Sequence, residues 1–317
     1  FLDVNTNPNS LPTATPAYVF ANALNTSAAI MVSPNETGMV WAGQWTQSNG
    51  YIISTTLFAY NFTNGDFNYW DNTYDNLNDY QYVINNATAN GQDFLKGPAK
   101  VMKAFNFQKL VDLYGNIPFS DALKGVGALA PKFDDQKAVY EGLITLLDDG
   151  IKDLKANAFS SSTAGADFVF KGNTTSWIKF ANSLKLRILM RQSKVAGRDA
   201  YITAEINKIV AEGSGFITGA EVGVNPGYNP SAGQINPFYD TYGYSETNAR
   251  RAFNNWPRNT AFLINTLKST GDTTRMKRIA YAIGNENSAT AGVSTKAEIA
   301  DNYVGVPLGS SSGYLPA

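Results

Sequence analysis

The stretch KAFNFQKLVDLYGNIPFSDAL, residues 103–123, predicts an α-helix that stops abruptly. Gly115 can adopt the positive φ that ends many helices, and Pro118 cannot continue one. A helix with a wide apolar face must pack against other elements. The apolar residues recur at helical spacings of three and four, and the face that they form consists of Val101, Ala104, Phe105, Phe107, Leu110, Val111 and Tyr114.

Other stretches of the chain show the same amphipathic period, and each needs a neighbour to cover its apolar side. Helical hairpins are therefore expected over about 68–114 and 135–213. Stacked hairpins of this kind are typical of tetratricopeptide-like folds, although no exact 34-residue register is visible. The predicted class is all-α, and the further helical stretches are 16–31, 70–84, 136–157, 174–194 and 198–213.

Local signals refine two of these predictions and add a short helix. Asp134 and Asp135 are expected to supply an N-cap and first-turn acid to the helix that follows them. Thr174 or Thr175 is expected to cap the helix over 174–194, whose Trp177 and Phe180 should be core residues. The stretch GMVWAGQWTQ, residues 38–47, predicts a short helix with Trp41 and Trp45 on one side.

The chain is expected to form a single domain, 1–317, with three regions. Residues 1–15 are rich in Asn, Pro, Thr and Ser and predict an extended arm. Residues 16–214 form the helical-repeat core. Residues 215–317 are dense in Gly, Pro, Asn and Tyr, which predicts a loop-rich ligand region.

The amino-acid composition argues against several classes of function. The 25 Lys and Arg residues nearly balance 26 Asp and Glu, so no overall field attracts nucleic acid. The chain has no Cys and no His, which excludes thiol and imidazole catalysis and the soft or imidazole-based metal sites. We expect no metal and no cofactor. The sequence contains no run of 18 apolar residues, so it predicts no membrane-spanning helix.

Three spaced segments together resemble the SusD/RagB-like family of Bacteroidota outer-membrane nutrient-binding lipoproteins. AKVMKAFNFQKLVDLYGNIPFSDAL resembles that family's most recognisable helix and turn. SWIKFANSLKLRILMRQS is similar to a second family helix, and INPFYDTYG followed by LKSTGDTTRM resembles its substrate-side loop. The opening FLDVNTNPNSLPTATP resembles the start of the mature arm, and YVGVPLG resembles a later loop.

The resemblance implies a lipid-anchored protein at the cell surface of the bacterial outer membrane. Such a protein captures an oligosaccharide, or in some branches a peptide, and passes it to a SusC-like TonB-dependent transporter. The lipidated residue would lie upstream of Phe1 and provide the only membrane attachment. Family members usually extend further, so we expect the chain to be incomplete at its C-terminal end.

Residues 236–258 contain the predicted ligand site. Sugar recognition needs flat aromatic faces together with amide, carboxylate and guanidinium groups that hydrogen-bond to hydroxyls. The expected contacts are Tyr239, Asp240, Tyr242, Tyr244, Asn248, Arg250, Asn254 and Trp256. An alternative is that the aromatic residues of this loop fold back over the helical core. Trp41, Trp45 and Trp70 can also face ligand, although their helical spacing favours packing.

Two other functions compete with nutrient binding. One is an all-helical glycosidase that uses a carboxylate pair, drawn from Asp134, Asp135, Glu141, Asp240 and Glu246. The other is a cytosolic helical-repeat scaffold, for which more charge and fewer Asn, Thr and Trp residues would be expected. The residue inventory favours a binding protein without enzymatic activity.

Overall fold

The described part of the chain is mostly helical, with 58% helix and 5% strand, which confirms the predicted all-α class. Two compact units make up the chain: Phe1–Met31 with Tyr69–Gly227, and Val32–Asn68 with Tyr228–Ala317. We call these the first and the second unit. The computed structural model describes residues 14–33, 36–48, 55–61, 63, 65, 69–219, 222–280, 282 and 300–308. Almost all of the predicted N-terminal arm lies outside these described residues.

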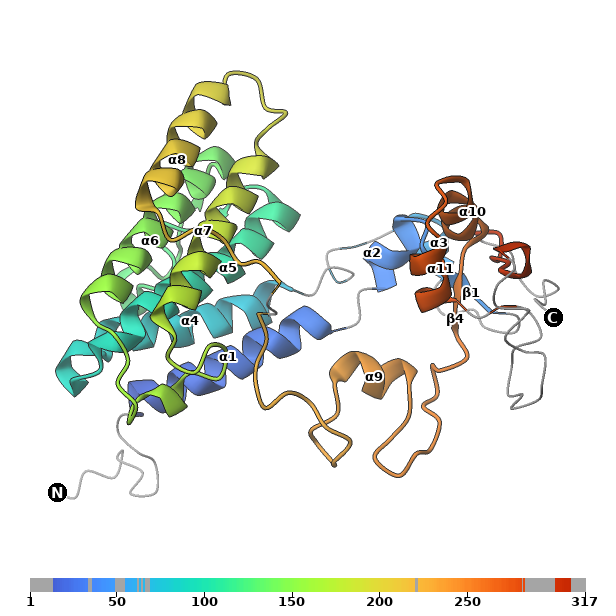
Figure 1. The fold of residues 1–317 in the computed structure, drawn as a ribbon, viewed down its shortest axis with the longest axis horizontal. Helices are drawn as coiled ribbons and strands as arrows, with labels where there is room; N and C mark the ends of the chain where they lie inside the picture. Colours follow the sequence, from blue (N-terminus) through green and yellow to red (C-terminus); the bar gives the residue numbers. More distant parts are fainter. Residues whose placement is uncertain are drawn as a thin grey trace. The chain divides into compact units, whose positions relative to one another are not determined.

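The first unit contains the long helices of the protein (Figure 1). Consecutive helices from α4 to α8 pack against one another, as expected for helical hairpins, and α5 also contacts α7. Short 3-10 turns join several of them: η2 (Thr88–Asn90), η3 (Asp93–Leu95) and η5 (Ala164–Ala166). The long helices are α1 (Pro16–Val32), α4 (Trp70–Asn86), α5 (Lys96–Tyr114), α6 (Gln136–Ala156), α7 (Thr174–Arg191) and α8 (Asp199–Glu212).

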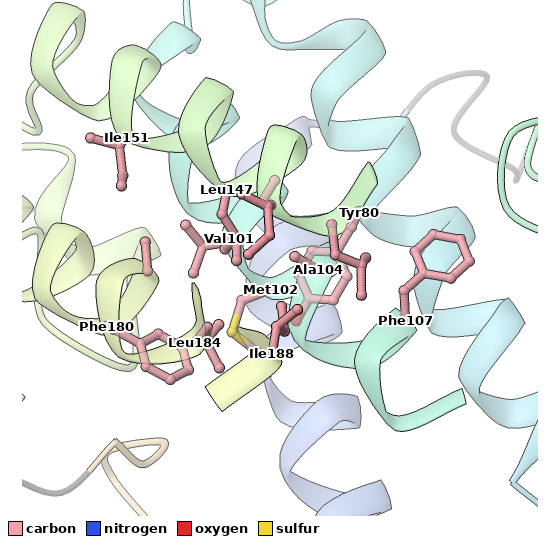
Figure 2. Close-up of a cluster of buried hydrophobic side chains, with 14 of the residues drawn as sticks. Tyr80, Val101, Met102, Ala104, Phe107, Leu147, Ile151, Phe180, Leu184 and Ile188 are labelled. Carbon is pink, nitrogen blue, oxygen red and sulfur yellow. The ribbon is translucent and has the colours of Figure 1, made fainter. Parts of the chain in front are cut away.

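The apolar faces predicted from the sequence meet in one core. Figure 2 shows side chains from successive helices gathered there, such as Val101 of α5, Leu147 of α6 and Ile188 of α7. Trp177 and Phe180 are buried, as predicted, and Trp177 contacts Phe20 of α1 with ring centroids 6.4 Å apart. Burial of each large apolar side chain stabilises the unit by about 1.5–3 kcal/mol before entropy is counted.

The ends of two helices test the predicted caps. The Asp135 carboxylate accepts a hydrogen bond from the Lys137 amide at 3.0 Å and caps α6, as expected. The prediction for α7 was wrong: Asn173 is the cap, and its Oδ1 accepts from the Ser176 amide at 2.9 Å. Asn173 precedes the first helical residue, Thr174, and the cap must lie outside the helical turn whose N–H groups it satisfies.

Helix α5 ends at Gly115, whose φ is +73° and ψ is −110°. The Gly115 amide donates to the Val111 carbonyl at 3.1 Å, and the chain then enters β2 (Ile117–Pro118). β2 pairs antiparallel with β3 (Phe133–Asp134), and η4 (Gly125–Gly127) lies in the loop between them. The Asp134 carboxylate holds the base of this loop by accepting from the Phe119 and Ser120 amides at 3.1 and 2.7 Å.

Replacing Gly115 by alanine is expected to lower the free energy of unfolding by about 1–2 kcal/mol, because only glycine adopts this φ without strain. A Cβ there would meet no neighbouring atom within 4 Å, so the cost is conformational and not a clash. Urea unfolding followed by circular dichroism measures the effect. Gly165→Ala is the matched control, since Gly165 also has open space but no positive φ. Equal stability of the two variants would contradict the expectation.

A single buried carboxylate organises the loop before α7. Asp167 is fully buried, and its Oδ1 accepts from the amides of Val169 and Phe170 at 2.9 and 3.1 Å. Its Oδ2 accepts from the Gly172 amide at 2.8 Å and from the Trp177 indole N–H at 2.7 Å. Asp167 therefore joins the turn over 167–172 to the core side of α7.

The second unit combines two segments that are distant in sequence. Strand β1 (Trp45–Gln47) pairs antiparallel with β4 (Pro257–Asn259), so that Trp45 lies opposite Asn259. The Thr260 hydroxyl also donates to the Gly43 carbonyl. The other elements are α2 (Glu36–Trp41), α3 (Thr55–Phe58), α9 (Pro237–Tyr242), α10 (Ala261–Ser269), α11 (Thr273–Ile279) and η6 (Ala300–Asn302).

The region around Trp41 and Trp45 differs from its prediction in two respects. The short helix ends at Trp41, because Gly43 has a φ of +67° and the chain then joins β4 as a strand. Trp45 is therefore a strand residue and not a helical one. The segment Val32–Asn68, which the sequence placed in the helical-repeat core, groups with the second unit. None of the helices within the described residues is long and apolar enough to cross a bilayer.

Candidate ligand-binding site

Four aromatic side chains of the second unit form a continuous group, here called the aromatic cluster: Trp45, Phe238, Tyr242 and Trp256. The Trp45 ring lies at its centre, with centroid distances of 5.8 Å to Phe238, 5.2 Å to Tyr242 and 6.1 Å to Trp256. Tyr242 also contacts Phe238 at 5.1 Å and Trp256 at 6.2 Å. The cluster joins β1, α9 and the residue before β4 into one structure.

Two predicted ligand contacts lie inside this cluster. Trp256 has 0% of its surface exposed and Tyr242 only 8%. The Tyr242 hydroxyl donates to Glu36 Oε1 at 2.6 Å, and burial together with that carboxylate raises the pKa of Tyr242. These positions correct the sequence prediction, because both rings fold back to form the core of their own unit. Neither presents a free aromatic face to a ligand in this structure.

Two exposed aromatic residues, Phe238 and Tyr239, lie at the start of α9. Asn236 caps this helix, since its Oδ1 accepts from the amides of Phe238 and Tyr239 at 2.9 and 3.3 Å. Pro237 occupies the first turn, where its missing N–H costs nothing. Tyr239 is 51% exposed and Phe238 is 41% exposed, and the Phe238 ring contacts half-buried Trp45. Tyr239 was predicted as a ligand contact, and Phe238 was not.

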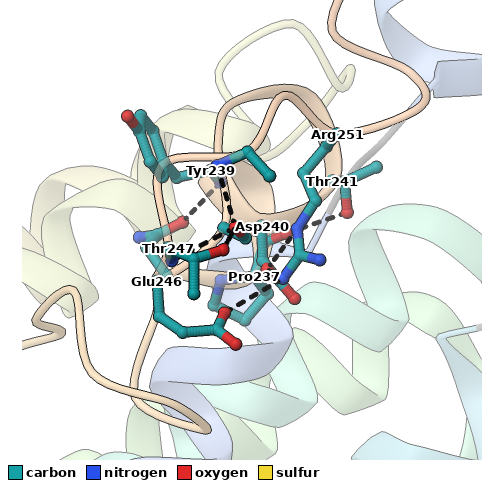
Figure 3. A network of polar contacts seen from close by, with 10 residues as sticks. Pro237, Tyr239, Asp240, Thr241, Glu246, Thr247 and Arg251 are labelled. Atoms are coloured by element: carbon teal, nitrogen blue, oxygen red, sulfur yellow. Dashed lines mark hydrogen bonds and ion pairs between the residues drawn. The ribbon is translucent and has the colours of Figure 1, made fainter.

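A polar network fixes the chain next to α9, as Figure 3 shows. Arg251 donates from Nε to Asp240 Oδ1 at 2.9 Å and also from Nη2 to the same oxygen. Its Nη2 lies 3.7 Å from the Glu246 carboxylate. Asp240 therefore has a structural partner and orients Arg251. The Asn254 side-chain amide donates to the Tyr242 carbonyl at 2.7 Å, so Asn254 holds the end of α9.

The remaining predicted contacts lie on a small hairpin over residues 243–251. Tyr244 and Arg250 form an antiparallel bridge, and the Arg251 amide donates to the Gly243 carbonyl at 3.0 Å. Asn248 lies in the turn with a φ of +60°. Tyr244 is half-buried, whereas Asn248 and Arg250 are exposed. Tyr244 and Arg250 therefore project from the same face of the hairpin.

The other tryptophan candidates separate into two environments. Trp41 of the second unit stacks on Tyr60 with centroids 5.8 Å apart and rings inclined by 21°, and Tyr60 is largely exposed. Trp70 belongs to the first unit and packs between Tyr114 at 5.1 Å and Phe133 at 5.9 Å. Trp70 therefore fits the packing alternative, and Trp41 borders an exposed aromatic surface.

Over the described residues, no group of three carboxylate, His or Cys side chains could hold a metal ion.

Comparison with known proteins identifies the family. The sequence profile of SusD-like proteins, described as starch-binding and associating with the outer membrane, matches residues 8–313. This chain belongs to the SusD-like family. The match covers nearly the whole sequence and agrees with the resemblance found in its motifs. A comparison with curated proteins finds no significant match.

Solved structures of SusD homologues share the fold of this SusD-like chain. A SusD homologue from Bacteroides fragilis is 21% identical, with a TM-score of 0.70 over 94% of this chain and 59% of that protein. A SusD/RagB family protein from Bacteroides thetaiotaomicron is 22% identical, with a TM-score of 0.62 over 85% of this chain and 54% of the other. A chitin-binding SusD homologue from Flavobacterium johnsoniae is 20% identical, with a TM-score of 0.63 over 92% and 61%. The SusD-like chain therefore spans about three fifths of the length of these structures.

Proposed function

We propose that this chain is a cell-surface nutrient-binding protein that captures oligosaccharides at the exposed edge of the aromatic cluster. The observation that carries the proposal is the pair of exposed rings at the start of α9, Phe238 and Tyr239, of which Phe238 contacts half-buried Trp45, in a member of the SusD-like family. The family description names starch, and the Flavobacterium relative binds chitin, so both precedents are glycans.

The chemistry of this edge suits a sugar. Aromatic faces accept the C–H groups of a pyranose ring, and such contacts contribute about 0.5–1.5 kcal/mol beyond area burial. Hydrogen bonds to sugar hydroxyls largely replace bonds to water and add little net free energy. We therefore expect weak binding, with dissociation constants of roughly 10 micromolar to millimolar.

The delivery step and the location are part of the same proposal and rest on the family. We propose that the protein is lipid-anchored upstream of Phe1 at the bacterial outer membrane and passes its ligand to a SusC-like TonB-dependent transporter. A peptide ligand is the alternative cargo. We also retain the single-domain proposal, in which the first and second units together form one binding protein.

The contacts of the carboxylates favour binding over catalysis. Asp135 caps α6, Asp134 holds the loop before it, and Glu141 pairs with Arg198 at 2.6 Å. Asp240 and Glu246 lie around one guanidinium group, that of Arg251. A structural role therefore accounts for each candidate of the glycosidase alternative. Membership of the SusD-like family likewise disfavours the cytosolic scaffold.

Tyr239→Ala is expected to weaken oligosaccharide binding by roughly 3- to 10-fold, the loss of one stacking contact. Isothermal titration calorimetry with maltoheptaose and chitohexaose measures the affinity, and chromatography of the ligand afterwards should show no turnover. Tyr18→Ala is the control, because Tyr18 is 78% exposed but belongs to the first unit. Binding that is equal in both variants, or cleavage of the ligand, would refute this site.

A further inference from the structure

Two arginine side chains of the second unit converge on Asn255, and neither has a carboxylate partner among the residues that the structure describes. Arg250 donates from Nη1 to Asn255 Oδ1 at 3.3 Å. Arg258 donates from Nη1 to the Asn255 carbonyl and to the Pro257 carbonyl, both at 3.0 Å. Neither guanidinium group has an ion pair among the described residues, whereas Arg251 and Arg275 each do. Within the described part of the unit, two positive charges without an ion pair therefore lie around one asparagine.

The same contacts leave a specific part of each guanidinium group unused. Arg250 and Arg258 both donate from Nη1, and neither Nε nor Nη2 has a protein acceptor within the described residues. The Nε–Nη2 edge carries two parallel N–H groups, the arrangement that binds a carboxylate or sulfate in two hydrogen bonds. Arg251 uses this edge on Asp240 in the same part of the unit. The Arg250 and Arg258 guanidinium groups, in contrast, are held by hydrogen bonds from Nη1 alone.

An aromatic ring accompanies this pair. Tyr244 and Arg250 are directly opposed in the antiparallel bridge of the hairpin over 243–251. Opposed residues in such a bridge project from the same face, with Cβ atoms about 4.5–5.5 Å apart. The Tyr244 ring is half-buried and the Arg250 side chain is exposed. The hairpin thus projects a tyrosine and an arginine whose Nε–Nη2 edge has no acceptor among the described residues from one face.

We propose that Tyr244, Arg250 and Arg258 form a subsite for an acidic sugar, in which the guanidinium groups bind a uronate carboxylate and Tyr244 contacts the pyranose ring. This inference rests on the proposed function and names its ligand class. A uronic acid fits because each of its sugar units has both a pyranose ring face and a carboxylate attached to that ring. An acidic peptide lacks the pyranose ring, and the binding experiment below distinguishes such a peptide from a uronate.

The test compares charged and uncharged forms of one oligosaccharide by isothermal titration calorimetry. The probes are tetragalacturonate and tetramannuronate, each with its carboxyl-reduced neutral counterpart. We expect the acidic forms to bind at least 10-fold more tightly at 50 mM NaCl, with the difference shrinking at 300 mM as salt screens the charges. Arg250→Gln and Arg258→Gln should each lower acidic-sugar affinity about 5- to 10-fold and change neutral-sugar affinity less than 2-fold.

Two further variants separate this subsite from general charge effects. Arg250→Lys keeps the charge but removes the paired N–H edge, so it should recover only part of the affinity. Arg275→Gln removes an exposed arginine of the same unit that pairs with Asp272, and it should bind as wild type does. Circular dichroism verifies that each variant is folded.

The outcomes distinguish this inference from the proposed function. Neutral forms that bind as tightly as acidic ones, with no effect of Arg250→Gln or Arg258→Gln, would overturn the acidic subsite and leave oligosaccharide capture standing. A tetraglutamate peptide that binds more tightly than either uronate would overturn the choice of a sugar. If none of the neutral or acidic oligosaccharides binds, both proposals fail.

Discussion

Replacing Trp256 by alanine is expected to lower the free energy of unfolding by about 3–5 kcal/mol, the usual cost of truncating a fully buried tryptophan. Trp256 has 0% exposure and contacts both Trp45 and Tyr242. Its carbonyl also accepts from the Ser48 amide at 2.8 Å, next to the pairing of β1 with β4. Urea unfolding followed by tryptophan fluorescence, with hydrogen exchange of β1 and β4 amides, measures the loss.

Two control substitutions make this expectation specific. Phe253→Ala removes an aromatic ring three residues earlier that is 45% exposed, and it should change stability by less than about 0.5 kcal/mol. Trp256→Phe should lower the free energy of unfolding much less than Trp256→Ala does. The phenylalanine loses no hydrogen bond, because the Trp256 indole N–H is buried without a hydrogen-bond acceptor among the described residues. A stable Trp256→Ala protein that has lost only ligand binding would restore the earlier interpretation of Trp256 as a ligand contact.

Asp167→Ala is expected to have a similarly large effect on the first unit, about 3–5 kcal/mol of unfolding free energy. The Trp177 indole N–H would lose its acceptor while buried, and three backbone N–H groups would lose theirs while partly buried. Each buried donor without a partner costs about 1–3 kcal/mol, and part of that cost is relieved as water enters the loop. Circular dichroism during urea unfolding measures the change.

The matched control is Asp135→Ala, which removes an exposed aspartate with a single cap bond to the Lys137 amide. It should cost about 1 kcal/mol. Asp167→Asn should fall between the two, because its one carbonyl oxygen can serve only half of the donors and its NH₂ group faces the rest. If Asp167→Ala costs no more than Asp135→Ala, the four hydrogen bonds do not organise this turn as described.

The helical repeat could be predicted from the sequence because periodicity is a local signal. The face of α5, from Val101 to Tyr114, is visible in the spacing of its own residues, and most of it is buried as expected, with Phe105 and Tyr114 half-buried. The Gly115 stop was predicted for the same reason. Asn173 was missed because Thr174 and Thr175 are also good caps, and only the first helical residue decides among them.

The candidate site was predicted less completely because its structure depends on distant partners. Trp45 becomes a strand residue by pairing with Asn259, and Trp256 becomes a core residue by packing on Trp45. Neither fact has a local signature in an irregular, aromatic-rich segment. One usable signal was overlooked: Asn236-Pro237 is a helix-start pattern, and it positions Phe238 and Tyr239 at the exposed edge.

The composition of the second unit from two distant segments has a consequence for the order of assembly during synthesis. The hydrogen bond from Tyr242 to Glu36 spans 206 residues, and the one from Thr260 to Gly43 spans 217. At about 5–20 residues per second, a ribosome needs roughly 10–40 seconds to reach the partner of Glu36. The helices α4 to α8, which contact their neighbours in sequence, are translated completely within that interval. β1 thus leaves the ribosome as an unpaired strand edge, and the first unit has all its residues before the aromatic cluster can close.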